Sequence, residues 1–467
     1  MPSSSRNMLS MNSKTHNRRF VVIGGVTAGM SAASVVKRSD PDAEVLIFEK
    51  GQFISYDTCS IPYFIGDVID DHRRLIELTP EQAKQNFQID VWTQHEAMAI
   101  YPDKQSVVVL DRNTGEEKTV HYDALLLATG GVPITPPVPG IDLPNIFQVR
   151  TLSDSLHLKQ YITKYAPRKA TIIGGGYLGL EMAEACSRLD MDVTILEKFG
   201  NIMGTMGSDV THLIEQHLWE QGVHLFKEVS LDSFEAIDRK CGAVVVGGQR
   251  LDTDLVMIAI GVRPEIALAR GAGIEIGDTG AIAVNSSLQT SIENIYAAGD
   301  CTEVTHLVSG TKMYLPLGAT ACKQGCIAGE NIVQPGSHEF KGVVGTTVTK
   351  VFDLQVARTG VSAMDAKRLG FDPAISTITA DSRDRNYPGS QTITITLIAD
   401  KTSKQLLGAE MVGKEGVAKR IDVFAAALDN QMTAQALTHL DLSYAPPYSP
   451  PWDPILVAAN MASKKLS

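Results

Sequence analysis

The sequence predicts an α/β protein with two βαβ units followed by an α+β region. Three observations support this fold class. A buried strand, a glycine-rich turn and a helix of small residues follow one another near residue 20, and the same order recurs near residue 170. Beyond residue 341 the pattern changes to alternating strands and amphipathic helices. The chain has 467 residues, which is enough for about three domains.

Composition excludes several classes of protein. The chain has 42 Lys and Arg against 53 Asp and Glu, and this net charge of −11 disfavours binding to nucleic-acid phosphates. No apolar run approaches the roughly 18–20 residues that span a bilayer, so we expect no membrane segment. The six cysteines are widely spaced, as is typical of a reducing, cytoplasmic compartment. The eleven histidines show no metal-type spacing, so no metal site is expected.

The first 19 residues form a separate segment. They are rich in Ser, Asn and Arg and contain no acidic residue, a composition that transit peptides share. The segment lacks an amphipathic period and the apolar stretch of a secretory signal. We therefore expect a disordered tail over residues 1–19.

The first βαβ unit begins at Phe20. A strand over 20–23 leads into a turn that contains Gly24, Gly25 and Gly29, and a helix over about 28–39 follows. The next strand, 44–48, ends at Glu49, which lies 20 residues after Gly29, where an acidic residue binds a ribose hydroxyl in dinucleotide sites. Because Val26 replaces the middle glycine of the usual fingerprint, the carboxylate at Glu49 is needed to support a nucleotide site here.

The second unit carries the full fingerprint Gly174-x-Gly176-x-x-Gly179 between a strand over 170–174 and a helix that continues to residue 188. The first glycine allows the turn, the second lets the backbone approach a pyrophosphate, and the third lets the helix pack on the strand. Glu197 ends the next strand and would repel a 2′-phosphate, which favours NADH. Lys198 beside it keeps NADPH as an alternative. Two sites suggest one flavin and one nicotinamide dinucleotide.

Further along the chain, buried strands over 123–131, 254–261 and 294–300 each end in a tight turn, and the proline-rich stretch 132–144 is typical of a linker. In the last region, alternation over 392–398 predicts a strand, and helices are expected around 419–428 and 433–440. The segment 444–454 contains too many prolines for a regular helix or a central strand.

Cys59 is the main candidate for a reactive side chain. It lies ten residues after Glu49, and Pro62 favours the first turn of a helix, so the dipole of that helix is expected to lower the thiol pKa. The alternative is an inert buried thiol, which is common for a single cysteine. The nearby nucleotide motif favours a redox role. The other cysteines are expected to be inert, although Cys322 and Cys326 lie one helical turn apart.

The two glycine-rich turns and Cys59 are accompanied by four further features: Ala128-Thr-Gly130, Arg150, the segment 290–300 and Leu315-Pro-Leu-Gly318. In this combination the chain resembles the pyridine nucleotide-disulfide oxidoreductases, which bind FAD and NAD(P)H. The resemblance covers about residues 19–460. It implies two Rossmann-like dinucleotide-binding domains, the second inserted in the first, and a C-terminal α+β dimerisation domain. The implied boundaries are 20–150 with 265–340 for FAD, 151–264 for NAD(P)H and 341–467 for dimerisation.

The resemblance also implies which residues contact the cofactors. For FAD they are Gly24, Gly25, Gly29, Glu49, Lys50, Ala97, Thr129, Gly130, Arg150, Asp300, Leu317 and Gly318. For NAD(P)H they are Gly174, Gly176, Tyr177, Gly179, Glu181, Glu197 and Gly261. In this arrangement Tyr177 would gate the nicotinamide pocket and Glu181 would lie near the flavin.

No second cysteine lies near Cys59, so the chain resembles the single-cysteine branch, which contains coenzyme A-disulfide reductases, NADH oxidases, NADH peroxidases and persulfide reductases. Thr27 stands where the oxidases and peroxidases carry an acid–base histidine, and residues 414–422 and 444–448 resemble coenzyme A-disulfide reductases. The implied activity passes electrons from NAD(P)H through FAD to Cys59, which reduces a small-molecule disulfide or persulfide. An NADH oxidase that uses a cysteine sulfenic acid is the alternative, and a non-catalytic flavin-binding redox sensor is less favoured.

Substrate contacts are implied at Arg38, Ser55 and Thr58. The resemblance further implies a homodimer in which the proline-rich tail of one subunit covers Cys59 of the other. The hydroxyl of Tyr444, helped by Tyr387, would then donate a proton to the leaving thiolate. The alternative is that the aromatic side chains of the tail close the core of their own domain.

Overall fold

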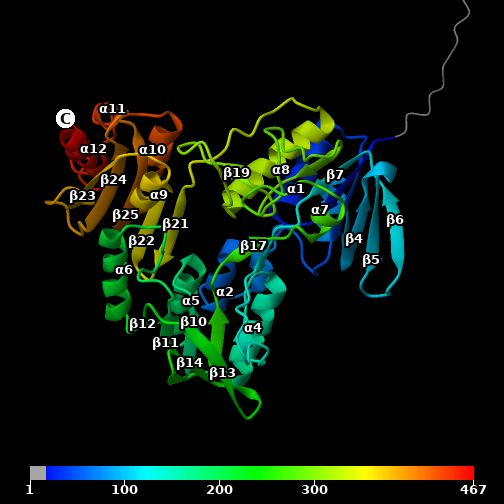
Figure 1. The fold of residues 1–467 in the computed structure, drawn as a ribbon, viewed down its shortest axis with the longest axis horizontal. Coiled ribbons are helices and arrows are strands. Elements are labelled where there is room, and N and C mark those ends of the chain that lie inside the picture. Colours follow the sequence, from blue (N-terminus) through cyan, green and yellow to red (C-terminus); the bar gives the residue numbers. More distant parts are fainter. Residues whose placement is uncertain (1–16, 467) are drawn as a thin grey trace, which may run out of the picture.

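In a computed structural model, described here over residues 17–466, the chain forms three bodies, each built around one five-stranded sheet (Figure 1). The expected tail lies outside the described residues up to residue 16. Its last two residues are part of the fold, because the Arg18 guanidinium pairs with Asp40 at 2.7 Å and Arg19 begins the first strand. Among the described residues, no helix combines the length and apolar character needed to cross a bilayer.

The first sheet is parallel and has the order β18-β7-β1-β2-β3. Its strands are β1 (Arg19–Ile23), β2 (Glu44–Glu49), β3 (Asp90–Thr93), β7 (Ala124–Leu127) and β18 (Ile295–Ala297). Alternate side chains of β1 enter two different cores, as the two-residue period of a strand requires. Phe20 and Val22 pack with helices α1 (Thr27–Ser39) and α8 (Gly318–Val333). Val21 and Ile23 pack with β4 (His95–Tyr101) and β5 (Ser106–Asp111). These two strands form a three-stranded sheet with β6 (Glu117–His121).

The second sheet is also parallel, in the order β12-β11-β10-β16-β9. Its strands are β9 (Ile146–Phe147), β10 (Lys169–Ile173), β11 (Asp192–Leu196), β12 (His224–Phe226) and β16 (Leu255–Ile258). The same body contains the helices α4 (Leu152–Tyr165), α5 (Tyr177–Arg188) and α6 (Ser208–Glu220). It also contains a small antiparallel sheet of β13 (Leu231–Ile237), β14 (Lys240–Val246) and β15 (Gln249–Asp252). Because β18 of the first sheet follows this whole unit, the expected insertion of the second domain in the first is confirmed.

Two short strands, β8 (Gly131–Pro133) and β17 (Val262–Pro264), pair antiparallel where the chain enters and leaves the inserted unit. The remaining helical segments of the first two bodies are short. They are the 3₁₀ turns Thr58–Ser60, His72–Leu75 and Pro102–Lys104 and the helices α2 (Ile61–Ile65), α3 (Pro80–Phe87) and α7 (Ala267–Gly271). A further two-stranded ribbon joins β19 (Val304–Thr305) to β20 (Lys312–Met313).

The third body is an antiparallel sheet in the order β21-β22-β25-β24-β23. Its strands are β21 (Thr347–Val351), β22 (Leu354–Gly360), β23 (Pro373–Asp381), β24 (Thr392–Asp400) and β25 (Leu406–Gly413), and its helices are α9 (Ala363–Arg368), α10 (Val417–Asp429), α11 (Ala434–Leu437) and α12 (Pro454–Leu466). Every residue of β25 is buried. The helix expected over 433–440 is shorter than expected, and residues 444–453 have neither helix nor strand, as the prolines predict.

Candidate active site

Two cavities lie at the carboxyl ends of the two parallel sheets, which is where open α/β sheets bind ligands. The first-sheet cavity, of about 590 Å³, is lined by residues that directly follow β1, β2 and β7. The second-sheet cavity, of about 910 Å³, is lined by residues that follow β10, β11 and β16. Thr58 and Arg150 line both cavities, and Cys59 lines the second. The two spaces therefore meet beside the candidate thiol.

The glycine-rich turn at the first-sheet cavity requires its glycines. Gly24 has φ +107°, and a Cβ on it would lie 2.2 Å from the carbonyl oxygen of Ala128. A Cβ on Gly29 would lie 1.9 Å from the carbonyl oxygen of Gly24, so the helix can pack on the turn only without a side chain there. The carboxylate of Glu49 accepts hydrogen bonds from the amides of Gly25 at 2.8 Å and Gly51 at 2.7 Å.

The turn at the second-sheet cavity repeats this geometry. Gly174 again has φ +107°, and a Cβ on Gly179 would lie 2.0 Å from the carbonyl oxygen of Gly174. Gly176 differs, because a Cβ there would meet no atom within 4 Å and would enter the cavity. The buried carboxylate of Glu197 accepts from the amides of Gly175 at 2.7 Å and Phe199 at 2.9 Å.

Both cavities fit a dinucleotide. The N-cap residues of α1, α5 and α8, which are Val26, Gly176 and Leu317, provide no side-chain cap, so the first amides of these helices are available to an anion. The open space at Gly176 lets a ligand approach the backbone there. At the edge of the first-sheet cavity, the buried Tyr314 hydroxyl has no partner among the described residues and lies 3.2 Å from a Cβ built on Gly131.

The residues expected to contact cofactors separate into two groups. Those that line a cavity are Gly24, Glu49, Lys50, Ala97, Thr129, Gly130, Arg150, Gly174, Gly176, Tyr177, Glu197, Gly261 and Asp300. Those that line neither are Gly25, Gly29, Gly179, Glu181, Leu317 and Gly318. The Arg150 guanidinium pairs with the Asp300 carboxylate at 2.7 Å, which joins the two sheets at the place where the cavities meet.

Several residues that the sequence motifs did not indicate also line the cavities, among them Tyr56, Glu265 and Phe199. The position of Phe199 in the sequence could have indicated that it lines the cavity. It is an aromatic residue two positions after the strand-ending Glu197, and it is 65% exposed at the cavity. Tyr56 and Glu265 lie in irregular segments and had no comparable signal.

Cys59 lies in the 3₁₀ turn that precedes α2. Asp57 caps this turn, since its carboxylate accepts from the amide of Cys59 at 2.9 Å. A Cβ built on Gly318, the first residue of α8, would lie 3.8 Å from the Cys59 sulfur. Cys59 therefore lies directly before the five-residue α2, as the sequence suggested, and also beside the first residue of the 16-residue α8.

The expected lowering of the Cys59 pKa is wrong in this structure. Although the side chain is exposed at the cavity, surrounding protein atoms desolvate the thiolate, and this burial together with the Asp57 carboxylate raises the thiol pKa. A hydrogen bond with Thr58 acts in the opposite direction and is the weaker effect.

Tyr177 and Glu181 lie on one face of α5, one turn apart, and both contact β21 of the third body. The Tyr177 hydroxyl lies 2.6 Å from the Thr347 hydroxyl, and the Glu181 carboxylate accepts from the Thr349 hydroxyl at 2.8 Å. Burial raises the pKa of both side chains. This helix therefore connects the second-sheet cavity to the C-terminal sheet.

The residues expected to contact substrate are not all near the thiol. Thr58 is adjacent to it. Ser55 is buried, and its amide donates to the carbonyl of Gly25 at 2.9 Å, so it supports the glycine-rich turn. Arg38 is exposed near the far end of α1, about 16 Å from the start of that helix, and lines neither cavity.

Tyr387 and Tyr444 belong to the third body and line neither cavity of their own chain. Tyr387 is 40% exposed, Tyr444 50%, Tyr448 78% and Trp452 60%. The alternative in which the tail aromatics close their own core is therefore wrong.

Two nucleotide-type cavities that meet at a cysteine define an oxidoreductase with two dinucleotide sites. Residues 18–325 match the family described as pyridine nucleotide-disulphide oxidoreductase, and residues 346–454 match its dimerisation domain. The chain belongs to this family, which uses FAD and NAD(P)H.

Individual relatives match over nearly the whole chain. The NAD(P)H coenzyme A polysulfide/persulfide reductase of Pyrococcus horikoshii is 35% identical over 447 residues, which cover 95% of this chain and 98% of that protein. An NADH oxidase of Methanocaldococcus jannaschii is 35% identical over 450 residues, covering 96% and 99%. The solved structure of a NAD-dependent persulfide reductase from A. fulgidus has a TM-score of 0.93 at 38% identity and covers 96% of this chain and 83% of that one.

Proposed function

We propose that this oxidoreductase is a homodimeric NAD(P)H-dependent reductase of a small-molecule disulfide or persulfide, in the manner of coenzyme A-disulfide and persulfide reductases. The observation that carries the proposal is the position of Cys59 where the two cavities meet, against the N-terminus of α8. The similarity to a coenzyme A polysulfide/persulfide reductase supports the substrate class.

The first-sheet cavity would hold FAD and the second-sheet cavity NAD(P)H. The carboxylates of Glu49 and Glu197 are held at the strand ends by backbone amides, where each could accept from a ribose hydroxyl. Tyr177, which starts α5 and lines the second-sheet cavity, would cover the nicotinamide position. When bound, FAD supplies two-electron transfer from NAD(P)H to the disulfide formed at Cys59.

Cys59 would act as the nucleophile. Its thiolate attacks one sulfur of the substrate RS–SR; the S–S bond breaks, RS⁻ leaves, and Cys59–S–SR forms. Two electrons then cleave this mixed disulfide, which returns the Cys59 thiolate and releases the second thiol after one proton is taken up. With a persulfide RS–SH, attack on the outer sulfur releases RS⁻ and leaves Cys59–S–SH, whose reduction releases sulfide.

The N-terminus of α8 is the feature that would stabilise the thiolate form. The first amides of this 16-residue helix have no side-chain cap, and the partial positive charge of a helix N-terminus favours an anion. This effect opposes the desolvation that raises the Cys59 pKa. Thr58, beside the thiol, would contact the substrate sulfur.

Tyr444 and Tyr387 would act in trans, on the partner subunit's Cys59. Their exposure in the single chain supports this, because aromatic side chains on a dimerisation domain are typical of an interface. From there, the Tyr444 hydroxyl could donate a proton to the leaving thiolate, with Tyr387 beside it. Arg38 would contact a distant anionic part of the substrate.

An NADH oxidase is the second candidate, because a relative of that name is as similar as the persulfide reductase. In an oxidase, Cys59 would cycle between thiolate and sulfenic acid. Thr27 disfavours this chemistry, because a threonine hydroxyl is not an effective general acid or base near pH 7.

The testing experiment measures NADH consumption by the purified flavoprotein with coenzyme A disulfide, polysulfide, hydrogen peroxide and oxygen as separate acceptors. The proposal expects the sulfur acceptors to have the highest kcat/KM. A higher value with oxygen would establish the oxidase instead.

A further inference from the structure

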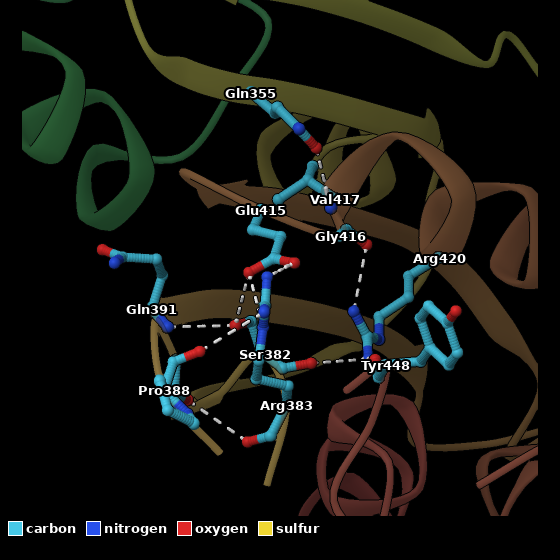
Figure 2. Close-up of polar contacts among 11 residues, drawn as sticks. Gln355, Ser382, Arg383, Pro388, Gln391, Glu415, Gly416, Val417, Arg420 and Tyr448 are labelled. Carbon is cyan, nitrogen blue, oxygen red and sulfur yellow. Dashed lines mark hydrogen bonds and ion pairs between the residues drawn. The ribbon is translucent and has the colours of Figure 1, made fainter. Parts of the chain in front are cut away.

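Arg420 lies where three segments of the C-terminal body meet (Figure 2). It belongs to the first turn of α10, and its side chain is only 11% exposed. The three segments are the β23–β24 hairpin 382–391, the loop 414–416 and the tail 444–453. None of them makes a regular helix or strand across its whole length, so side-chain contacts help to hold them together.

The guanidinium reaches all three segments. Its Nε donates to both carboxylate oxygens of Asp453, at 3.2 and 3.0 Å, and this carboxylate is itself 10% exposed. Its Nη2 donates to the carbonyls of Ser382 at 2.9 Å and Tyr448 at 3.1 Å, and its Nη1 donates to the carbonyl of Gly416 at 3.3 Å. Only the planar fork of an arginine has donors in all these directions.

Gly416 is adapted to this side chain. It has φ +76°, and a Cβ on it would lie 2.1 Å from Nη1 of Arg420. A residue with a side chain at this position would displace the guanidinium from its carbonyl partners. The position of the Arg420 guanidinium at the start of α10 therefore depends on a glycine at residue 416.

The segments that Arg420 joins carry the two candidate proton donors. Tyr387 lies at the tip of the hairpin, and Tyr444 begins the tail. The hairpin and tail also touch directly, since the amide of Asp384 donates to the carbonyl of Pro446 at 3.2 Å. Arg383 pairs with Glu415 and lies 5.7 Å from the centre of the Tyr387 ring, so the hairpin is tied to the loop before α10 as well.

We propose that Arg420 is a positioning residue for the reaction. It sets the hairpin and the tail relative to each other so that Tyr387 and Tyr444 reach the partner subunit's Cys59 together. This inference rests on the function proposed above, which assigns both tyrosines to that site.

A purely structural role in starting α12 does not need Arg420. Asp453 holds that end of the helix with other contacts, because its carboxylate accepts from the amide of Ile455 at 2.9 Å and from the hydroxyl of Ser449 at 2.8 Å. Removing the guanidinium leaves these bonds in place. What it removes is the guanidinium's own link between the tail and the hairpin, while the backbone bond from the amide of Asp384 to the carbonyl of Pro446 remains.

The test compares Arg420→Lys and Arg420→Gln with a matched control, Lys419→Gln. Lys419 is the preceding residue of α10, is 91% exposed and contacts only Asp422, at 3.0 Å, in the interactions described here. Both Arg420 variants should keep the flavin spectrum and the rate of flavin reduction by NADH. Their kcat for the faster of coenzyme A disulfide and polysulfide should fall about tenfold to 10²-fold, which is what misplacing a reacting group by about 1 Å costs. The control should match the wild type.

Double variants separate positioning from general loosening. If Arg420 acts through Tyr444, adding Arg420→Lys to Tyr444→Phe should lower kcat little further. If the double variant instead loses kcat by the product of the two single-variant factors, the proposal is overturned. It is also overturned if the Arg420 variants keep the wild-type kcat while Tyr444→Phe lowers it. A Tyr444→Phe variant with wild-type kcat would refute the proposed role of the tyrosine itself, which is a distinct result.

A mixed dimer provides the second measurement, which also serves if Arg420→Gln homodimers fold poorly. One subunit carries Cys59→Ser and the other Arg420→Gln. If Arg420 positions residues for the partner subunit's Cys59, one of the two sites is complete and about half of the wild-type activity remains. Activity no higher than that of the Arg420→Gln homodimer, or folding failure of Arg420→Lys as well, would overturn the proposal.

Discussion

Cys59 and Gly318 are neighbours in space, although they are far apart in the chain: a Cβ on Gly318 would lie 3.8 Å from the Cys59 sulfur. Gly318 begins α8, so the thiol faces the positive end of a long helix from the same domain. The pKa of Cys59 is nevertheless raised, because desolvation and Asp57 both oppose the thiolate. The α8 N-terminus and the Thr58 hydrogen bond thus favour the charge on the thiol, whereas desolvation and Asp57 oppose it.

Replacing the thiol is the first prediction. Cys59→Ser should keep the fold, the flavin spectrum and flavin reduction by NADH, since Cys59 supports none of the glycine-rich turns. Disulfide reduction should fall by at least about 10³-fold, because a serine hydroxyl is a poor nucleophile at pH 7 and cannot form the mixed disulfide. Stopped-flow and steady-state assays measure the two steps separately. Near wild-type turnover would show that another group carries the reaction.

Asp57 provides a second prediction, about pH. Because its carboxylate raises the Cys59 pKa, Asp57→Asn should lower that pKa while the amide oxygen still caps the turn. Because only the thiolate reacts with iodoacetamide, the alkylation rate rises with pH around the thiol pKa. The plot of alkylation rate against pH for the variant should therefore be shifted to lower pH. At pH 7 we therefore expect faster alkylation of the variant than of the wild type. A curve shifted to higher pH would contradict the electrostatic assignment.

Thr27 leads to a third prediction. With no histidine in the first glycine-rich turn, hydrogen peroxide should be a slow acceptor compared with a disulfide or persulfide. Thr27→His should raise peroxide turnover more than disulfide turnover, since an imidazole can exchange protons near pH 7. Thr27→Ser is the matched control. Peroxide as the best acceptor of the wild-type enzyme would instead place the chain with the peroxidases.

The shared site gives a fourth prediction. Tyr444→Phe should slow disulfide reduction by about 10²-fold or more, as expected for loss of a general acid, without changing flavin reduction. A mixed dimer with Cys59→Ser on one subunit and Tyr444→Phe on the other has one complete site if the residues meet across the interface, so about half the activity remains. Activity no higher than that of the single variants would place both residues in one subunit.

Coenzyme choice is the fifth prediction. Glu197 should give a preference for NADH, and Lys198, which is exposed beside it at the same cavity, should account for any activity with NADPH. Lys198→Gln should lower kcat/KM for NADPH about tenfold, which is about 1.4 kcal/mol, and leave that for NADH nearly unchanged. A wild-type kcat/KM at least tenfold higher with NADPH would refute the assigned preference.

The nucleotide domains could be predicted from the sequence because their requirements are local. The spacing of glycines and of the strand-ending acids expresses contacts within about thirty residues, such as that of Glu49 with Gly25. The prediction of a proline-rich segment without regular structure at 444–454 is confirmed up to residue 453 for the same reason, whereas Pro454 begins α12. These rules describe the chain's own backbone, so distant packing does not alter them.

The electrostatics of Cys59 could not be predicted in this way. The sequence indicated the nearby Pro62 and its short helix, whereas α8 comes from a segment far along the chain and the burial of the thiol depends on the folded structure. The contacts of Arg420 likewise join three segments, and only the folded sheet brings them together. The roles assigned to the site residues, and the domain boundaries, stay predictions.

The bonds from backbone amides to Glu197 limit how evolution or design could change the coenzyme. The usual route from NADH to NADPH replaces the acid that repels the added phosphate. Here both oxygens of that acid already hold the turn, through Gly175 and Phe199. A neutral replacement would leave at least one of these amides without its partner, so the turn would lose order as the charge is removed. A successful switch would need compensating substitutions in the same loop, and single replacements should lose affinity for both coenzymes before they gain any for the new one.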